Sequence, residues 1–354
     1  MIREARGNLL DADVDALVNT VNTVGVMGKG IALQFKRAYP VMFEAYAAAA
    51  KAGEVQLGRM FVYPTAALSG PRYVVNFPTK AHWRSRSRLA DVRAGLADLV
   101  AVVRALDIAS VAVPPLGCGN GGLEWAQVEP LITEAFGDVP DVDVIVYPPA
   151  GAPSADAMPD NTVRPPLTLG KAALVDILNR YAVPAVEVSL IEVQKLMYFL
   201  QASGQDLRLR YVKDHYGPYA DNLRHVLRAV EGHYLIGYGD ASATVHAAGP
   251  ISVLPGAADE AAEVLSAHPE TRERIERVLR LVDGFESPYA LELLATVHWI
   301  TSNESPRAAD DPEVAVDLVR RWSTRKQRMF GPDHVTAAWR RLRDEDWLPS
   351  PVPA

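Results

Sequence analysis

The 354-residue sequence contains a single cysteine, Cys118, and eight histidines that are scattered along the chain. One cysteine excludes a disulfide within the chain and a metal cage built from cysteine thiolates. The histidines do not show the H-E-x-x-H spacing that would indicate a zinc hydrolase. The sequence therefore predicts a protein with no metal and no other cofactor.

Long hydrophobic runs are missing as well. No stretch of 18 apolar residues occurs, and the first residues, M-I-R-E-A-R-G-N, predict a short polar-flanked strand and not a signal peptide. The net charge is only −7 and 49% of the residues are hydrophobic, which is typical of a soluble globular protein. We therefore expect a cytoplasmic protein, and the length predicts two domains.

Glycine, by contrast, is concentrated in two clusters. In the first, the apolar run Ala16–Val21 is followed by Gly25, Gly28 and Gly30 and then by apolar residues at helical spacing. This order predicts a strand, a glycine loop and the start of a helix. Such a loop lets backbone N–H groups and the helix N-terminus face a phosphate. The same pattern also fits a simple tight turn.

The second cluster follows the predicted strand Ser110–Val113. Its sequence, P-P-L-G-C-G-N-G-G-L-E-W, places four glycines between positions 117 and 122, before a helix that starts near Trp125. Two glycine loops at the C-terminal ends of two strands can face one another across the sheet edge and hold one diphosphate. The pair is therefore a stronger indication of diphosphate binding than either loop alone.

These stretches resemble the macrodomains, which bind ADP-ribose. The resemblance rests on Gly7–Leu10, Asn19–Ile31 and Leu116–Trp125. Within macrodomains, N-T-V-N-T-V-G-V-M-G-K-G-I-A-L-Q-F-K and N-F-P-T-K (Asn76–Lys80) are similar to the DarG antitoxins, which remove ADP-ribose from DNA. The resemblance implies that the following residues bind ADP-ribose: Asn8, Leu9, Asn22, Gly28, Lys29, Gly30, Ile31, Thr79, Leu116, Gly117, Cys118, Gly119, Asn120, Gly121, Gly122 and Leu123.

Lys80 follows the predicted strand Tyr73–Phe77, a proline and a threonine, so it lies at the sheet edge where the glycine loops lie. Desolvation against Phe77 and Trp83 would lower the pKa of its ammonium group and make it nucleophilic toward the anomeric carbon of a ribose. Residue type alone favours a solvated loop lysine. The DarG resemblance implies instead that Lys80 is the essential catalytic residue, either as a nucleophile through an imine on the opened sugar or as a proton carrier.

A second catalytic group is less evident. Related macrodomain hydrolases pair their lysine with an aspartate in the second glycine loop, where this chain has Gly121. Asn22 is the second candidate catalytic residue and the best candidate for holding the distal ribose hydroxyls, although an asparagine before a glycine turn is as often a turn former. Many macrodomains bind the adenine amino group with an aspartate after the first strand, where Asn8 here offers a carbonyl oxygen. We expect Cys118 to be a small phosphate-loop residue, because no neighbouring histidine activates it.

A basic and aromatic stretch follows the candidate lysine. Residues 81–88 read A-H-W-R-S-R-S-R, which offers one ring for base stacking and three arginines for phosphates. A solvated segment before a helix explains this stretch equally well, because three charges give only a modest hold on phosphates. The candidate DNA contacts are Trp83, Arg84, Arg86 and Arg88.

Apolar periodicity predicts an α/β domain over residues 1–150, a proline-rich linker over 151–166 and a mainly α-helical domain over 167–354. The alternating strands and helices of the first domain predict an α/β/α sandwich with a mixed sheet, the three-layer fold of macrodomains. Its expected strands are Ile2–Arg6, Ala16–Val21, Met60–Tyr63, Tyr73–Phe77, Ser110–Val113 and Val142–Tyr147, and its helices Ile31–Arg37, Val41–Lys51, Arg88–Leu106 and Trp125–Phe136. The second domain is expected to contain helices Leu169–Tyr181, Val188–Ala202, Tyr219–Glu231, Thr271–Val282, Tyr289–Thr301, Pro312–Arg328 and His334–Asp344, with a strand at Leu207–Val212.

The second domain shows no catalytic motif, and 28 acidic against 22 basic residues follow position 150. Its stretches Ile191–Gln201 (I-E-V-Q-K-L-M-Y-F-L-Q) and Asp214–Leu223 (D-H-Y-G-P-Y-A-D-N-L) resemble the Panacea or SocA-like antitoxin domains. The resemblance implies that this domain binds and neutralises DarT, a toxin that attaches ADP-ribose to thymine bases of single-stranded DNA. The apolar residues of the first stretch lie at helical spacing and are more typical of a core than of an interface.

Two functions remain open on the sequence. The preferred one is an antitoxin that removes ADP-ribose from DNA, as a repair activity, and also blocks the toxin. The other is a non-catalytic ADP-ribose-binding module, or a macrodomain hydrolase that acts on ADP-ribosylated protein or O-acetyl-ADP-ribose. A measurement of turnover separates them.

Overall fold

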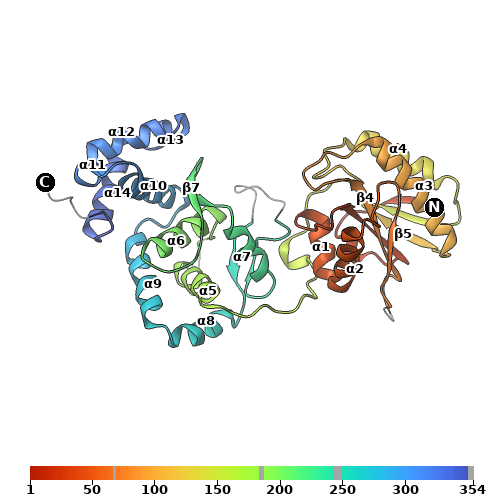
Figure 1. The fold of residues 1–354 in the computed structure, drawn as a ribbon, viewed down its shortest axis with the longest axis horizontal. Helices are drawn as coiled ribbons and strands as arrows, with labels where there is room; N and C mark the ends of the chain where they lie inside the picture. Colours follow the sequence, from red (N-terminus) through yellow and green to blue (C-terminus); the bar gives the residue numbers. More distant parts are fainter. Residues whose placement is uncertain (67–68, 183–186, 242–248, 350–354) are drawn as a thin grey trace. The chain divides into compact units, whose positions relative to one another are not determined.

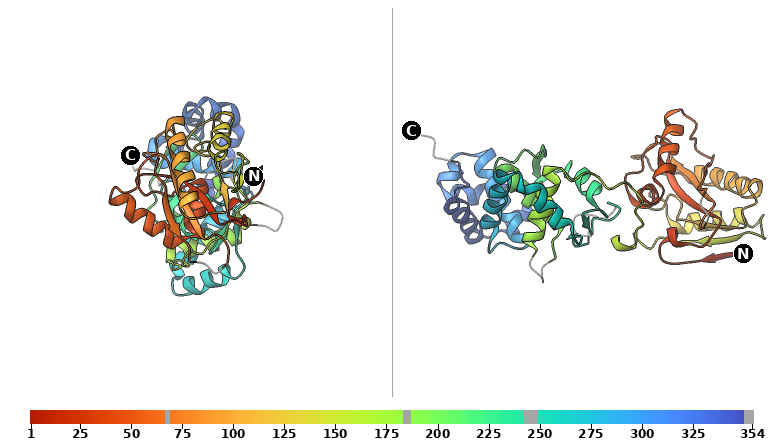
Figure 2. Two further views of the ribbon diagram at one scale, coloured as in Figure 1. Left: turned by 90° about the vertical axis from the view of Figure 1, so that its right-hand side faces the viewer. Right: turned by 90° about the horizontal axis from the view of Figure 1, so that it is seen from below.

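The computed structural model describes residues 1–66, 69–182, 187–241 and 249–349. The described chain forms two compact units, the first made chiefly of Met1–Val163 and the second of Arg164–Gly239 with the residues from 249 onward. In Figures 1 and 2 the first unit runs from red to yellow and the second from yellow-green to blue. Each unit buries a hydrophobic core of its own.

The first unit is built on a six-stranded mixed sheet with the strand order β1-β6-β5-β2-β4-β3. Its strands pair in parallel except for the edge strand β3, which is antiparallel to β4. The strands are β1 (Ile2–Glu4), β2 (Ala16–Asn22), β3 (Phe61–Pro64), β4 (Tyr73–Lys80), β5 (Ser110–Val113) and β6 (Asp143–Val146). The helices are α1 (Gly30–Ala38), α2 (Pro40–Lys51), α3 (Leu89–Ala105) and α4 (Trp125–Phe136), with 3₁₀ turns η1 (Leu9–Asp11) and η2 (Ala155–Ala157).

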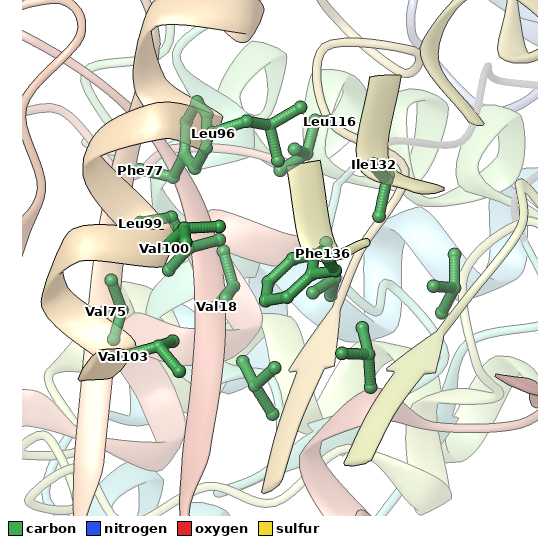
Figure 3. Close-up of a cluster of buried hydrophobic side chains, with 14 of the residues drawn as sticks. Val18, Val75, Phe77, Leu96, Leu99, Val100, Val103, Leu116, Ile132 and Phe136 are labelled. Atoms are coloured by element: carbon green, nitrogen blue, oxygen red, sulfur yellow. The ribbon is translucent and has the colours of Figure 1, made fainter. Parts of the chain in front are cut away.

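Helices cover both faces of this sheet. Alternate side chains of a strand point to opposite faces, so Ala16 and Val18 of β2 join the core under α3 and α4, whereas Leu17 and Val21 join the core under α1 and α2. Figure 3 shows the first of these cores, with Val18 facing side chains of the flanking helices. The unit is therefore the predicted three-layer α/β/α sandwich (Figure 1).

Part of the predicted linker, residues 151–166, packs on the first unit. Asn161 Nδ2 donates a 2.8 Å hydrogen bond to the backbone oxygen of Ala38. Asp160 forms an ion pair with Arg37 at 3.7 Å, and both side chains are largely buried. The proline content of this stretch predicts only an extended chain. It does not predict the packing, because proline content carries no information about these polar partners in α1.

The second unit is mainly helical, as predicted. Its helices are α5 (Leu169–Tyr181), α6 (Leu190–Ala202), α7 (Leu223–Val230), α8 (Ala257–Ser266), α9 (Pro269–Val282), α10 (Pro288–Trp299), the π-helical η3 (Ile300–Glu304), α11 (Arg307–Asp310), α12 (Pro312–Trp322), α13 (Thr324–Met329) and α14 (Pro332–Asp344). Two antiparallel pairs accompany them: β7 (Tyr211–Asp214) with β8 (Gly217–Ala220), and β9 (Leu235–Ile236) with β10 (Ser252–Val253).

Three predicted elements of this unit are corrected. The predicted helix Pro312–Arg328 is divided at Ser323, whose hydroxyl accepts a hydrogen bond from the Lys326 amide and caps α13 as a separate helix. The predicted strand Leu207–Val212 lies further along, as β7, and pairs with β8. That pairing takes up residues 217–220, so the helix predicted from Tyr219 begins only at α7.

Helix α6 carries the stretch that resembles the antitoxin domains. It is buried on nearly all sides, and Leu196, Met197, Phe199 and Leu200 are each at most 2% exposed. These side chains therefore build the core of the second unit, as their helical spacing indicates.

Candidate active site

Lys80 is the last residue of β4 and pairs with Asn22, the last residue of β2, after a register shift between Val21 and Asn22. The predicted strand ended at Phe77, but pairing continues through Pro78, so the lysine stands on a strand end and not in a loop. Partial burial lowers the pKa of the Lys80 ammonium group below its usual value. The Phe77 ring packs in the core against Gly95 of α3.

Loop 1, residues 23–29, connects β2 to α1. The carboxamide oxygen of Asn22 accepts hydrogen bonds from the amides of Val24 at 3.1 Å and Val26 at 3.3 Å, and its Nδ2 donates to the Val26 oxygen at 2.6 Å. The Tyr46 hydroxyl of α2 donates to the Asn22 backbone oxygen. Asn22 therefore shapes loop 1, which is the turn-forming role. Sequence reasoning missed Tyr46, because nothing in its alanine-rich helix distinguishes it.

Loop 2, Gly117–Gly122, connects β5 to α4. Gly117 and Gly122 both have φ of +73°, in the left-handed region that glycine adopts without strain. The loop closes on itself through hydrogen bonds from the Gly122 amide to the Gly119 oxygen at 3.0 Å and from the Leu123 amide to the Gly117 oxygen at 3.1 Å. Glycines at both ends are thus required by the geometry of the turn.

The two loops and the lysine meet at Asn120. A Cβ built on Gly30, the first residue of α1, would lie 3.4 Å from Asn120 Nδ2. The backbone oxygen of Asn120 accepts a 2.9 Å hydrogen bond from Lys80 Nζ. The two glycine loops therefore face one another at the C-terminal edge of the sheet, as the sequence predicts.

The 81–88 segment leads from Lys80 to α3 along the surface. Trp83 is 46% exposed, and the Arg84 guanidinium lies 4.4 Å from the centroid of its ring. Arg84, Arg86 and Arg88 are all exposed. The four candidate DNA contacts are thus available to a nucleic acid strand.

Both glycine loops hold this segment. Thr23 Oγ1 of loop 1 donates a 2.7 Å hydrogen bond to the Ala81 backbone oxygen. The Arg86 guanidinium lies against loop 2, since a Cβ built on Gly122 would be 3.3 Å from Arg86 Nε and Nη2. The basic segment is therefore part of the same structural centre as Lys80.

The part of the chain that the structure describes contains neither a candidate metal site nor a candidate membrane-spanning helix. No cluster of three or more histidine, cysteine, aspartate or glutamate side chains could hold a metal ion. None of the described helices combines the length and apolar character needed to cross a membrane.

Comparison with known proteins identifies the family. Residues 18–132 match the family model of the Macro domain. The DNA ADP-ribosyl glycohydrolase of Mycobacterium tuberculosis is 46% identical over 354 residues, which cover 97% of this chain and 99% of that relative. The solved macrodomain of Mycobacterium tuberculosis DarG is 62% identical and covers 42% of this chain and 99% of that one, with a TM-score of 0.42. The chain belongs to the DarG family of DNA ADP-ribosyl glycohydrolases.

A further relative joins two activities in one name. The DNA ADP-ribosyl transferase-DNA ADP-ribosyl glycohydrolase fusion protein of Thermosipho africanus is 32% identical over 158 residues, which cover 40% of this chain and 40% of that protein.

In this DarG-family chain, loop 2 has no room for an aspartate at Gly121. A Cβ built there would lie 2.3 Å from the Gly117 backbone oxygen and 2.3 Å from Ser87 Oγ. Such distances are far below van der Waals contact, so loop 2 in this conformation requires glycine at this position. Ser87 is a second residue that sequence reasoning missed, because a serine between two arginines carries no signal of its own.

Several predicted ligand contacts are buried. Leu9, Leu116 and Thr79 are at most 4% exposed, so they can offer a ligand backbone groups and not side chains. Lys29, the residue before α1, is exposed, whereas Gly28 and Ile31 are half-buried. These candidates would therefore offer a bound ligand mainly loop backbone groups.

The two remaining candidates are Asn8 and Cys118. Asn8 Oδ1 accepts a 3.1 Å hydrogen bond from the Leu10 amide and caps η1, and its Nδ2 donates to the Ala157 oxygen at 2.9 Å. An adenine amino group would have to share this oxygen. Burial, with the negative charge of Glu124, raises the pKa of the Cys118 thiol to about 11. Cys118 is thus a neutral thiol near pH 7, which opposes a nucleophilic role.

Proposed function

We propose that this protein removes ADP-ribose from thymine bases of single-stranded DNA, with Lys80 as the catalytic residue. The observation that carries the proposal is the meeting of Lys80 with both glycine loops at Asn120. A diphosphate bound between the loops would present its attached ribose to the lysine. Membership in the DarG family supports DNA as the carrier of the ADP-ribose group.

Loop 2 offers a place for the diphosphate at Gly119. A Cβ built on this residue would meet no atom within 4 Å, so the backbone there faces open space. Helix α1 begins at Gly30, beside the Asn120 side chain of loop 2; the Gly30 amide donates to the Asp240 backbone oxygen at 3.1 Å, and the positive end of the helix dipole favours an anion. Backbone groups and dipoles thus supply binding, which leaves the Lys80 side chain for chemistry.

The reaction breaks the bond between the anomeric carbon of the ribose and a ring nitrogen of thymine. Water supplies a hydroxyl to the carbon and a proton to the departing base, and the ribose passes through an oxocarbenium-like state. The lowered pKa of Lys80 raises its share of neutral amine near pH 7. Lys80 acts in one of two ways: its neutral amine attacks the anomeric carbon, the base leaves with a proton from the amine, and the ring opens to an imine that the water then hydrolyses; or Lys80 carries the proton to the base while water attacks the carbon directly. Borohydride reduction separates the two, because it fixes only the imine to the protein.

The 81–88 segment favours DNA over the alternative substrates. ADP-ribosylated protein and O-acetyl-ADP-ribose do not present a row of phosphates with flanking bases. Arg84, Arg86 and Arg88 suit such phosphates, and the exposed Trp83 ring suits a base.

The test uses the full chain with three substrates: ADP-ribosylated single-stranded DNA, ADP-ribosylated protein and O-acetyl-ADP-ribose. We expect release of free ADP-ribose from the DNA. Trp83→Ala with Arg84→Ala should raise the KM for DNA while leaving the affinity for free ADP-ribose unchanged, because neither side chain belongs to a glycine loop. Release from protein alone would favour the alternative hydrolase, and no release from any substrate would favour a binding module.

We further propose that the second unit binds and neutralises a DarT-type toxin. A toxin that modifies DNA needs a basic groove, which an acidic helical surface can occupy. Helix α8 supports this proposal, because it has three acids and no base, and Asp259 and Glu263 are exposed one turn apart on one face. The fusion relative, whose name joins a DNA ADP-ribosyl transferase to a glycohydrolase, supports the pairing of the two proteins.

The toxin proposal is tested in a Lys80→Ala background, where the product of the toxin is not erased. We expect this variant still to inhibit DNA modification by the toxin. Asp259→Lys with Glu263→Lys should weaken inhibition, whereas Asp317→Lys with Asp333→Lys, an equal charge change at exposed positions of α12 and α14, should not. Absence of inhibition by Lys80→Ala would contradict the proposal and leave the hydrolase proposal standing. The ADP-ribosylated DNA and the toxin are both inside the bacterial cell, so we place the protein in the cytoplasm as part of DNA repair.

A further inference from the structure

Ser87 has a buried hydroxyl group with no hydrogen-bond partner among the residues that the structure describes. The residue is only 6% exposed, so bulk water does not solvate the hydroxyl. An unpaired buried polar group costs about 1–3 kcal/mol, and native proteins contain few of them. A functional role of the Ser87 hydroxyl would explain why the protein keeps this unpaired group.

The chain from Lys80 to Ser87 is attached to three successive residues of loop 2. Lys80 Nζ donates to the Asn120 oxygen at 2.9 Å, and the Ser87 amide donates to the Gly121 oxygen at 3.0 Å. The Arg86 guanidinium packs against Gly122. Because both ends of this stretch hold the same loop, a shift of loop 2 is transmitted to the lysine.

The Ser87 hydroxyl fills the space of the side chain that loop 2 lacks. The Cβ position of Gly121 lies 2.3 Å from Ser87 Oγ and 2.3 Å from the Gly117 oxygen, so the two oxygens are close neighbours although they do not bond. A small movement of loop 2 toward Ser87 would let the hydroxyl donate to the Gly117 oxygen.

We propose that Ser87 is a positioning residue for the reaction at Lys80, and that its hydroxyl pairs with the Gly117 oxygen when loop 2 closes on ADP-ribose. This inference rests on the proposed function of the site. In the free protein the hydroxyl is unpaired, which destabilises the conformation of loop 2 described above. In the loaded protein it is paired, so part of the binding energy of ADP-ribose holds loop 2, and with it Asn120 and Lys80, in the reactive arrangement.

Ser87→Ala in the full chain tests the inference, with Ser85→Ala as the matched control. Ser85 lies in the same segment but is exposed. We expect Ser87→Ala to unfold at the same temperature as the wild type or higher, because it removes an unpaired buried group. Its kcat for release from ADP-ribosylated DNA should fall about 3- to 10-fold, the worth of one hydrogen bond, with KM changed less than kcat.

The pH profile adds a measurement that a purely structural role would not change. In the loaded protein a loosened loop 2 would leave Lys80 better solvated, so the rise of kcat with pH should move to higher pH in Ser87→Ala and stay in place in Ser85→Ala. Unchanged kcat and pH profile would overturn the inference, and so would a loss of kcat matched by a lowered unfolding temperature. Wild-type protein that releases no ADP-ribose from DNA would instead refute the proposed function itself.

Discussion

Lys80 Nζ donates a 2.9 Å hydrogen bond to the backbone oxygen of Asn120, the residue of loop 2 whose side chain also lies against Gly30. One residue thus connects the candidate catalytic lysine to both candidate phosphate loops. The amine can keep this acceptor through one N–H while its lone pair faces a sugar, so the Asn120 oxygen orients the amine. The position of Lys80 therefore depends on the conformation of loop 2.

Lys80→Ala should retain ADP-ribose binding and lose catalysis. Backbone loops supply the binding, whereas the side chain supplies the chemistry, so we expect kcat to fall by about 10²–10⁴-fold. Calorimetry with ADP-ribose and chromatography of released ADP-ribose measure the two effects. Lys51→Ala, at the exposed end of α2, is the control and should change neither. Substantial residual hydrolysis by Lys80→Ala would exclude the lysine as the catalytic residue.

The pH dependence of catalysis should report the environment of Lys80. Burial lowers the pKa of its ammonium group from 10.5, so the neutral amine becomes abundant at a lower pH than in free lysine. If the neutral amine reacts, kcat/KM rises with pH and levels off at a pH below 10.5. A profile that falls with pH through the same range would instead indicate that the ammonium form donates a proton.

Gly119→Glu should weaken ADP-ribose binding without unfolding the protein. The new side chain would enter open space, and its negative charge would stand where the diphosphate is expected. We expect the Kd measured by calorimetry to rise at least about tenfold, or 1.4 kcal/mol, and the effect to shrink at high salt. Gly119→Ala is the control and should bind nearly as the wild type. Equal affinities in all three proteins would mean that loop 2 does not bind phosphate.

Gly121→Ala should destabilise the protein, in contrast to Gly119→Ala. Its Cβ would lie 2.3 Å from the backbone oxygen of Gly117, which cannot move without opening loop 2. We expect a loss of about 1–3 kcal/mol in the free energy of unfolding, measured with denaturant. Gly121→Asp, which restores the acid of related hydrolases, should be no more active than Gly121→Ala. A fully stable and more active Gly121→Asp protein would show that loop 2 adapts.

Lys195 should make the stability of the second unit depend on pH. It is fully buried in α6, donates to the Pro218 oxygen at 2.8 Å, and burial with repulsion from Lys326 lowers its pKa to about 7. Between about pH 7 and 10.5 the unfolded chain keeps a proton that the folded chain has lost, so stability rises with pH in this range.

Scanning calorimetry of the wild type and Lys195→Met at pH 6 and pH 9 measures this effect. The rise in unfolding temperature should be smaller in Lys195→Met and should not vanish, because burial also lowers the pKa of Lys326, which stays in the variant. Parallel curves for the two proteins would show that Lys195 does not titrate in this range.

The sequence by itself determined the layers of the first unit and the place of its site. Alternating residues such as Leu17 and Val18 assign the two faces of β2, because a strand has a fixed period of two. Parallel strands end at one sheet edge, so the glycine loops that follow β2 and β5 had to face one another. The residue types of the loops and the two-residue period of side chains along a strand were sufficient to predict the layers and the place of the site.

Only the tertiary structure decided which side chains act on one another there. Ser87 and Gly121 are 34 positions apart in the sequence, and no local pattern shows that one fills the space of the other. The turn-forming bonds of Asn22, the extension of β4 to Lys80 and the break at Ser323 likewise depend on hydrogen-bond partners or strand pairing that residue type alone does not reveal. The sequence specifies the periodic elements because their rules are local, whereas the contacts of the site are set by packing between distant segments.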